Sequence, residues 1–401
     1  MMQALTNDNL QKKIIFTIFI IFVIRIGNFI PIPNVDQRYL VNILNSTSSL
    51  KPFFNGENLV LSVFSLGILP NINASILIQL LTSAVPFLEK LQKEEGESGR
   101  RQIKQYTRIL TLILAIFESL SISFSLRPIL FNWNMDVCFQ ITLALTTGSM
   151  IVLWLSDLIT ENGIGNGSSL LISLNILSTL PNTITTILQS GTLVSVGASF
   201  FSFTFLIIGI VYVQEAIRII PIVSSKQLFV QQNNSRSVKS SSAYIPLKIN
   251  QGGVMPVIFS STFLTFISVI ITYIINSQIL PINLNNSQFI NIFYAVINFG
   301  LILAFSLFYS SLILNPKDIA KELNKMAVTI PKIRPGKQTA SFLKKTISRL
   351  ALLGALFLAI LVTIPNIRSS YGLGVTSLLI LVGVTVETTR QIQTLLLSKF
   401  Y

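Results

Sequence analysis

Long apolar runs dominate this sequence and limit what the chain can fold into. A membrane-spanning helix needs about 20 mostly apolar residues, and the sequence holds ten runs close to that length. Only 11% of the 401 residues are charged, against about 25% in an ordinary soluble domain. The pattern predicts an all-α polytopic membrane protein with ten transmembrane helices, and it excludes a soluble globule and an outer-membrane barrel. The runs cover residues 14–30, 71–88, 109–126, 138–159, 164–180, 196–217, 254–276, 290–313, 347–364 and 372–389.

Two residue types that carry much enzyme and metal chemistry are scarce. The sequence contains no histidine, which excludes Ser-His nucleophiles and histidine-bound metals. Its single cysteine, Cys138, borders an apolar run and is expected to be a small buried side chain. No nucleotide-binding motif is present, because Gly163-Ile164-Gly165-Asn166-Gly167 lacks the strand and lysine of a P-loop; it predicts a tight turn between closely packed helices. We therefore expect no enzyme activity and no cofactor.

The net charge of +14 could indicate a nucleic-acid partner or a membrane orientation signal. Ten spans place both termini on one side of the membrane, and 24 of the 29 Lys and Arg residues then fall on that side. Such an imbalance is typical of cytoplasmic or stromal loops. The distribution favours orientation and gives no reason to expect a direct nucleic-acid role.

A short apolar stretch, residues 58–69, lies between the first two runs and ends at Pro70. Twelve residues are too few to cross the membrane as a helix, and proline breaks the stretch from the run that follows. The residues alone fit a half-inserted segment beside protein and an amphipathic surface loop equally well.

Two long basic loops, 218–250 and 314–346, lie on the positively charged side. The second holds Asn315-Pro316, a signal for a short amphipathic helix through Met326, and then a turn at 331–336. The loops suggest a docking surface for a large acidic partner; a solvated surface beside anionic lipid is the alternative.

Five segments, in chain order, resemble the SecY/Sec61-alpha family, the channel subunit of the Sec protein translocase. They are Ile72-Asn73-Ala74-Ser75-Ile76 with the following Leu77–Thr82, the loop from Glu94 to Arg108, Gly163 to Gly167, Ile245 to Pro256, and Ile333 to Thr339. Together they span nearly the whole chain.

The resemblance implies a clamshell of two pseudo-symmetric five-helix halves, 1–190 and 191–401, around a pore. Precursor proteins would cross through the pore, and membrane helices would leave sideways between the second and seventh spans. The stretch 58–69 would be a plug helix that includes Leu59, Val60, Leu61, Ser62, Val63 and Phe64.

The resemblance also implies roles for individual residues. A constriction ring would consist of Ile72, Ile76, Ile176, Met255 and Thr385. The family usually has an aliphatic residue where Thr385 stands. Residues for docking a motor or the ribosome would be Lys248, Arg334, Lys337, Arg236 and Lys239.

The implied partners are SecE and a SecG-like subunit, the SecA ATPase, the ribosome or signal-recognition-particle pathway, signal sequences and membrane lipids. The short tail after the last span and the Ile-, Asn-, Phe- and Lys-rich composition resemble a plastid-encoded member in the thylakoid membrane, with a bacterial plasma membrane as the alternative. A ten-helix secondary transporter is the competing function, but it has only Glu118 as an intramembrane ionisable candidate.

Overall fold

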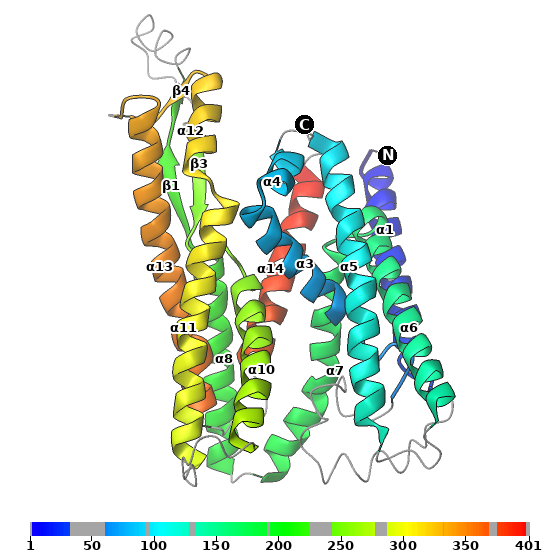
Figure 1. Ribbon diagram of the computed structural model, residues 1–401. Coiled ribbons are helices and arrows are strands. Elements are labelled where there is room, and N and C mark those ends of the chain that lie inside the picture. The colour runs from blue at the N-terminus through cyan, green and yellow to red at the C-terminus, as the bar shows by residue number, and fades with distance from the viewer. Residues whose placement is uncertain are drawn as a thin grey trace, which may run out of the picture. The chain divides into compact units, whose positions relative to one another are not determined.

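The chain folds into twelve helices and four short strands in the described residues of this computed structural model (Figure 1). The structure describes residues 2–32, 61–93, 96–127, 134–190, 193–224, 243–276, 287–331, 333–368 and 375–397. Each of the ten apolar runs overlaps a helix, and the run 71–88 is divided between two helices at Val85. The helices are α1 (Met2–Gly27), α3 (Leu69–Ala84), α4 (Pro86–Lys93), α5 (Gly96–Ser125), α6 (Met135–Asn162), α7 (Gly167–Ser190), α8 (Leu193–Glu215), α10 (Met255–Asn276), α11 (Ser287–Ile313), α12 (Pro316–Lys325), α13 (Lys337–Arg368) and α14 (Val375–Leu397).

Five stretches of helix in the described residues are long and apolar enough to cross a membrane. They are Gly96–Phe124, Met135–Asn162, Ile292–Lys325, Lys337–Thr363 and Val375–Leu397. Large apolar side chains such as Phe117 and Trp154 point outward from two of these helices, at 67% and 59% exposure. Exposed side chains of this kind fit a hydrocarbon environment and would be costly in water.

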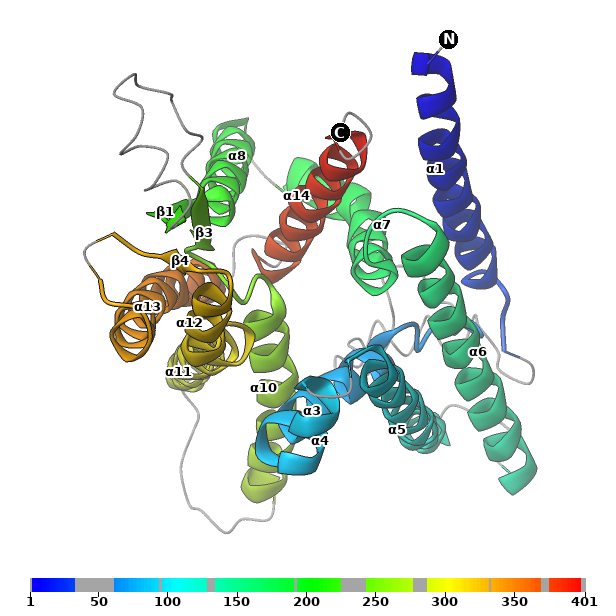
Figure 2. The same ribbon diagram turned by 90° about the horizontal axis from the view of Figure 1, so that it is seen from above.

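The chain divides into two compact units, residues 1–186 with 384–401 and residues 187–383. In the first unit, α5 packs against α3 and α6, and α6 also packs against α1 (Figure 2). In the second, α11 packs against α10 and α13, and α12 packs against α13. The predicted halves, 1–190 and 191–401, stay a prediction.

The buried face of α6 organises the first unit through small residues. Gly148, Ser149 and Ser156 lie on this face with Ile141 and Leu145. Small side chains let helices and loops approach closely within a membrane, where packing replaces the hydrophobic effect. The start of α7 uses the same property, because a Cβ on Gly167 would lie 2.8 Å from the carbonyl carbon of Ser156. The predicted tight turn at 163–167 is confirmed, and Cys138 is buried at 5% exposure as expected.

The two basic loops contain strands that the sequence did not reveal, and this corrects the expectation of plain loops. Strand β1 (Ile217–Pro221) pairs antiparallel with β3 (Tyr244–Lys248), with Ile217 opposite Lys248. Strand β2 (Val223–Ser224) pairs with β4 (Val328–Thr329). Because β2 belongs to the first loop and β4 to the second, the backbone joins both loops into one structure.

Candidate functional site

Residues 61–68, the described part of the short apolar stretch, form turns and not the regular helix that was expected. The amide N of Ser65 donates to the Ser62 carbonyl, and that of Gly67 donates to the Phe64 carbonyl, at 3.0 and 2.9 Å. Gly67 has a φ of +55°, which ends the turns and redirects the chain. Pro70 does not break a helix here; it lies in the first turn of α3, where its missing N–H costs no hydrogen bond. Leu59 and Val60 lie outside the described residues.

The segment 61–68 is packed into the core of the first unit. Leu61 is fully buried, and it joins Leu66 in one apolar cluster with residues of α5 and α6. The amide N of Ile32 donates to the Leu61 carbonyl, and the amide N of Val63 donates to the Ile30 carbonyl, both at 3.1 Å. Non-helical backbone is tolerated at membrane depth only when protein or a water-filled cavity surrounds it, and these contacts meet that condition.

Two glycines allow the segment to seat this deeply. A Cβ on Gly148 of α6 would overlap the Val63 carbonyl oxygen, and a Cβ on Gly27 of α1 would overlap the Phe64 ring. Beside Gly148, the Ser149 hydroxyl donates to the Gly67 carbonyl at 3.2 Å. The seat therefore depends on side chains that are absent or small at these positions.

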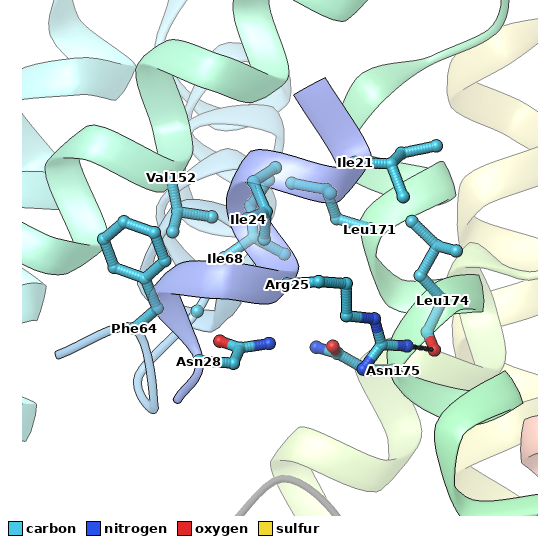
Figure 3. A pocket seen from close by; sticks show the side chains of 11 residues that line it. Ile21, Ile24, Arg25, Asn28, Phe64, Ile68, Val152, Leu171, Leu174 and Asn175 are labelled. Atoms are coloured by element: carbon cyan, nitrogen blue, oxygen red, sulfur yellow. Dashed lines mark hydrogen bonds between the residues drawn. The ribbon is translucent and has the colours of Figure 1, made fainter. Parts of the chain in front are cut away.

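A small pocket borders the seated segment, between α1, α6 and α7 (Figure 3). The Arg25 guanidinium reaches across it and donates to the Leu174 carbonyl at 2.6 Å. Asn28 and Asn175 lie beside the guanidinium, and Phe64 lies on the far side of the pocket. An arginine inside an apolar run is costly unless it faces protein, and the hydrogen bond to Leu174 shows that Arg25 faces protein.

The predicted ring residues occupy partly exposed positions. On α3, the buried residues are Pro70, Ala74, Ile78 and Thr82. Ile72 and Ile76 each follow a residue of this stripe by two positions, which is a rotation of about 200° around the helix. They therefore lie on the face opposite the buried residues.

The remaining ring residues come from three helices. Ile176 on α7 and Met255, the first residue of α10, are half-buried, and Thr385 on α14 is exposed. Ile72, Ile76, Ile176 and Thr385 belong to the first unit and Met255 to the second. Their common role as a ring stays a prediction.

Helices α3 and α5 are joined by polar pairs that sequence reasoning missed. The Asn73 amide donates to the Glu118 carboxylate at 2.9 Å, and the Thr111 hydroxyl donates to the Asn71 side-chain oxygen at 3.3 Å. Glu118 stood out in the sequence as an acid within an apolar run, but its partner lies 45 residues away. Nothing in the local pattern indicates that pairing.

The predicted docking residues border a folded basic surface. Beneath it lies a cluster of apolar side chains from both loops and from α13: Ile220, Leu247, Leu323, Ile330, Leu343, Ile347 and Leu350. Lys248, Arg334 and Lys337 are exposed. The Thr339 hydroxyl donates to the Arg334 carbonyl at 2.9 Å, and Gly336 has a φ of +99°, so the Arg334 turn has a defined shape. Arg236 and Lys239 lie outside the described residues.

The fold and this arrangement define a helical, multi-pass membrane protein with a buried non-helical segment and a basic surface. A model of the SecY family matches residues 62–389. The protein translocase subunit SecY of Guillardia theta is 44% identical over 419 residues, covering 100% of this chain and 98% of the relative. The corresponding protein of Synechocystis is 41% identical, covering 100% and 95%.

Solved structures agree in fold. A structure concerned with the plug domain of SecY and the closed state of its channel has a TM-score of 0.70 at 17% identity, covering 97% of this chain and 93% of that one. Sec61 in a canine ribosome–channel complex has a TM-score of 0.63 at 16% identity, covering 97% and 93%. The chain belongs to the SecY family, the protein-conducting channel subunits of the Sec translocase. The family assignment and the helical membrane fold predicted from the sequence are confirmed.

Proposed function

We propose that unfolded precursor proteins cross the membrane through this chain, past a constriction formed by Ile72, Ile76, Ile176, Met255 and Thr385. The observation that carries the proposal is the apolar, non-helical segment 61–68, which is buried immediately before α3. Because the segment is not helical and its seat is made by glycines, it can leave without unfolding a helix. It would close the channel when seated and open it when displaced.

The side chains proposed for the constriction suit this task. Ile72 and Ile76 lie on the face of α3 opposite its buried stripe and are only half-buried. Apolar constrictions exclude water and ions by dewetting, while aliphatic side chains can yield around a moving polypeptide. The hydroxyl of Thr385 would make this position of the ring less apolar than the others.

Site-specific crosslinking tests the path. A photoreactive amino acid is placed at Ile76 or Ile176, and a precursor is stalled in reconstituted membranes. We expect precursor adducts from both positions and none from a control at Phe117, which is 67% exposed on α5. Adducts from Phe117 alone would refute the proposed path.

The basic surface would receive the motor or the ribosome. Arg334 is exposed on a turn that is held by the Thr339 hydroxyl. Lys337 is exposed on the same loop, and Lys248 is exposed on the other basic loop. We expect Arg334→Glu to abolish SecA-driven transport while the protein still inserts. Lys90→Glu, at an exposed position of α4 outside both basic loops, serves as the matched control. Normal transport by the Arg334→Glu variant would contradict the docking proposal.

The setting proposed for the channel is the thylakoid membrane, with the termini and basic loops in the stroma and with SecE, and a SecG-like subunit, as partners. Plastid and cyanobacterial relatives at 41–44% identity support the plastid setting. The fold shared with a ribosome-bound Sec61 supports a ribosome as one docking partner. Immunogold labelling of a tagged chain on thylakoids tests the membrane setting. Co-purification with SecE tests that partner.

A further inference from the structure

The small pocket between α1, α6 and α7 carries one full positive charge. Arg25 lines it from the last turn of α1, and no acidic side chain is among the described residues that line it. Within the described part of the chain Arg25 makes no ion pair. A charged side chain among membrane helices is costly unless it is paired, so a negative group in this pocket would stabilise the protein.

The dipoles of the protein compensate this charge only in part. The C-terminus of a helix is equivalent to about half a negative charge, and Arg25 lies in that last turn of α1. The Leu174 carbonyl accepts a hydrogen bond from Nη2 of Arg25, which uses one of the five N–H donors of a guanidinium. Among the described residues, about half of the charge and the remaining donors are left without an acceptor.

Two asparagine side chains add further donors to the same space. Asn28 of α1 and Asn175 of α7 line the pocket, and Figure 3 shows their amides facing each other beside the Arg25 guanidinium. Neither side chain makes a hydrogen bond to another described residue. Each amide carries two N–H donors, so three side chains can direct donors at one small ligand. Apolar side chains such as Ile24 and Leu171 form the remaining walls.

The size of the pocket limits its occupant to one small ion or one water molecule. Its volume is about 20 Å³, and a single water molecule needs about 10–15 Å³. Chloride is only slightly larger than water, whereas phosphate and organic carboxylates are too large. Water brings no net charge and would leave the charge of Arg25 uncompensated, so the pocket favours a monatomic anion.

We infer that this pocket binds one chloride ion, held by the Arg25 guanidinium and by the side-chain amides of Asn28 and Asn175. Arginine and lysine side chains serve the same purpose in anion-selective pores. The ion would supply the negative charge that no described residue supplies, and the amides would replace part of its hydration shell.

The bound ion would also stabilise the seated segment. Phe64 and Gly67 belong to the segment 61–68 and complete the wall of the pocket, so the ion is enclosed only when the segment is seated. A ligand that binds one of two states better shifts the equilibrium toward that state. Chloride should therefore favour the seated segment. This second step rests on the proposed displacement of the segment, whereas the chloride site does not.

Bromide locates the ion directly, because it replaces chloride and scatters X-rays anomalously. The purified full chain is crystallised in bromide. We expect an anomalous peak within hydrogen-bond distance of the Arg25 guanidinium. A pocket without bromide would overturn the site.

Cysteine labelling measures the effect of chloride on the segment. Ser62, at 3% exposure, is replaced by cysteine in a background that carries Cys138→Ala. A membrane-impermeant maleimide is applied to idle channels in vesicles, in mixtures of chloride and gluconate at equal ionic strength. Gluconate is too large for the pocket, so the labelling rate should fall about tenfold as chloride rises from zero to ten times its Kd. Bromide beside Arg25 with a chloride-independent rate would keep the site and overturn the displacement of the segment.

Three variants separate the pocket from general effects of salt. Arg25→Met should abolish the dependence of the labelling rate on chloride. Asn175→Ala keeps the guanidinium and should raise the Kd for chloride by about tenfold or more, the usual loss for a hydrogen bond to a charged group. Arg100→Met removes an exposed arginine of α5 and should behave like the wild type. Equal chloride dependence in all three variants would overturn the inference, because effects outside the pocket would then explain it.

Discussion

Gly148→Ala is predicted to unseat the segment 61–68 and to open the idle channel. The added Cβ would overlap the Val63 carbonyl oxygen, and it would lie 2.8 Å from the Val63 carbonyl carbon and 2.9 Å from its Cγ1. Carbon atoms normally stay about 3.5–4.0 Å apart. The clash is between the backbone of Val63 and the helix α6, and neither can move away as easily as a flexible side chain could.

The magnitude follows from comparing the seated and displaced states. Alanine favours the helix by about 1 kcal/mol over glycine, but α6 is helical in both states, so this gain cancels. Overpacking costs about 1–3 kcal/mol and acts on the seated state alone. The displaced population should therefore rise by about 5- to 150-fold, at 1.4 kcal/mol for each factor of ten.

Cysteine labelling measures this population. Ser62, at 3% exposure, is replaced by cysteine in a background in which Cys138 is replaced by alanine. A membrane-impermeant maleimide is then applied to idle channels in vesicles. The labelling rate should rise with Gly148→Ala and not with Gly300→Ala, because a Cβ on Gly300 meets nothing within 4 Å. Equal rates in the two alanine variants would refute the reasoning.

Three further perturbations test the supporting contacts. Arg25→Met removes the charged hydrogen bond to the Leu174 carbonyl and should lower the free energy of unfolding in detergent by about 1.5–3 kcal/mol; an unchanged denaturant midpoint would contradict this. Asn73→Leu should lower the free energy of unfolding by about 0.6–1.7 kcal/mol because the hydrogen bond to Glu118 is lost. A double-mutant cycle with Glu118→Ala should show a coupling energy of that size, and a coupling energy of zero would contradict the pairing. Asn315→Ala should destabilise α12 by about 0.5–2 kcal/mol because its side chain caps the helix, seen as faster amide exchange in α12 only.

The long apolar runs located the helices because membrane helices must be long and apolar whatever their neighbours are. The N-cap at Asn315 with Pro316 behind it likewise predicted α12, since capping chemistry is local. The glycine turn before α7 was predictable for the same reason: Gly165 has a φ of +87°, which depends on the residue itself.

Contacts between distant residues were not predictable in this way. The pairing of β2 with β4 joins Val223 to Thr329, and strands of two residues carry too little pattern to be recognised. The turns at 61–68 were expected to be helical because the family resemblance implied a plug helix; the residues alone left the conformation open. Their actual conformation depends on a seat provided by Gly148 on another helix.

The sequence by itself determined the membrane class, the helices, the concentration of basic charge in two loops and the family. Each of these follows from composition, period or a contiguous motif. Only the tertiary structure decided that the two loops share a core, that Asn73 faces Glu118, and that Arg25 reaches Leu174. Those features depend on which helix faces lie together, and the packing of small side chains such as Gly148 fixes that choice without leaving a periodic signal in the sequence.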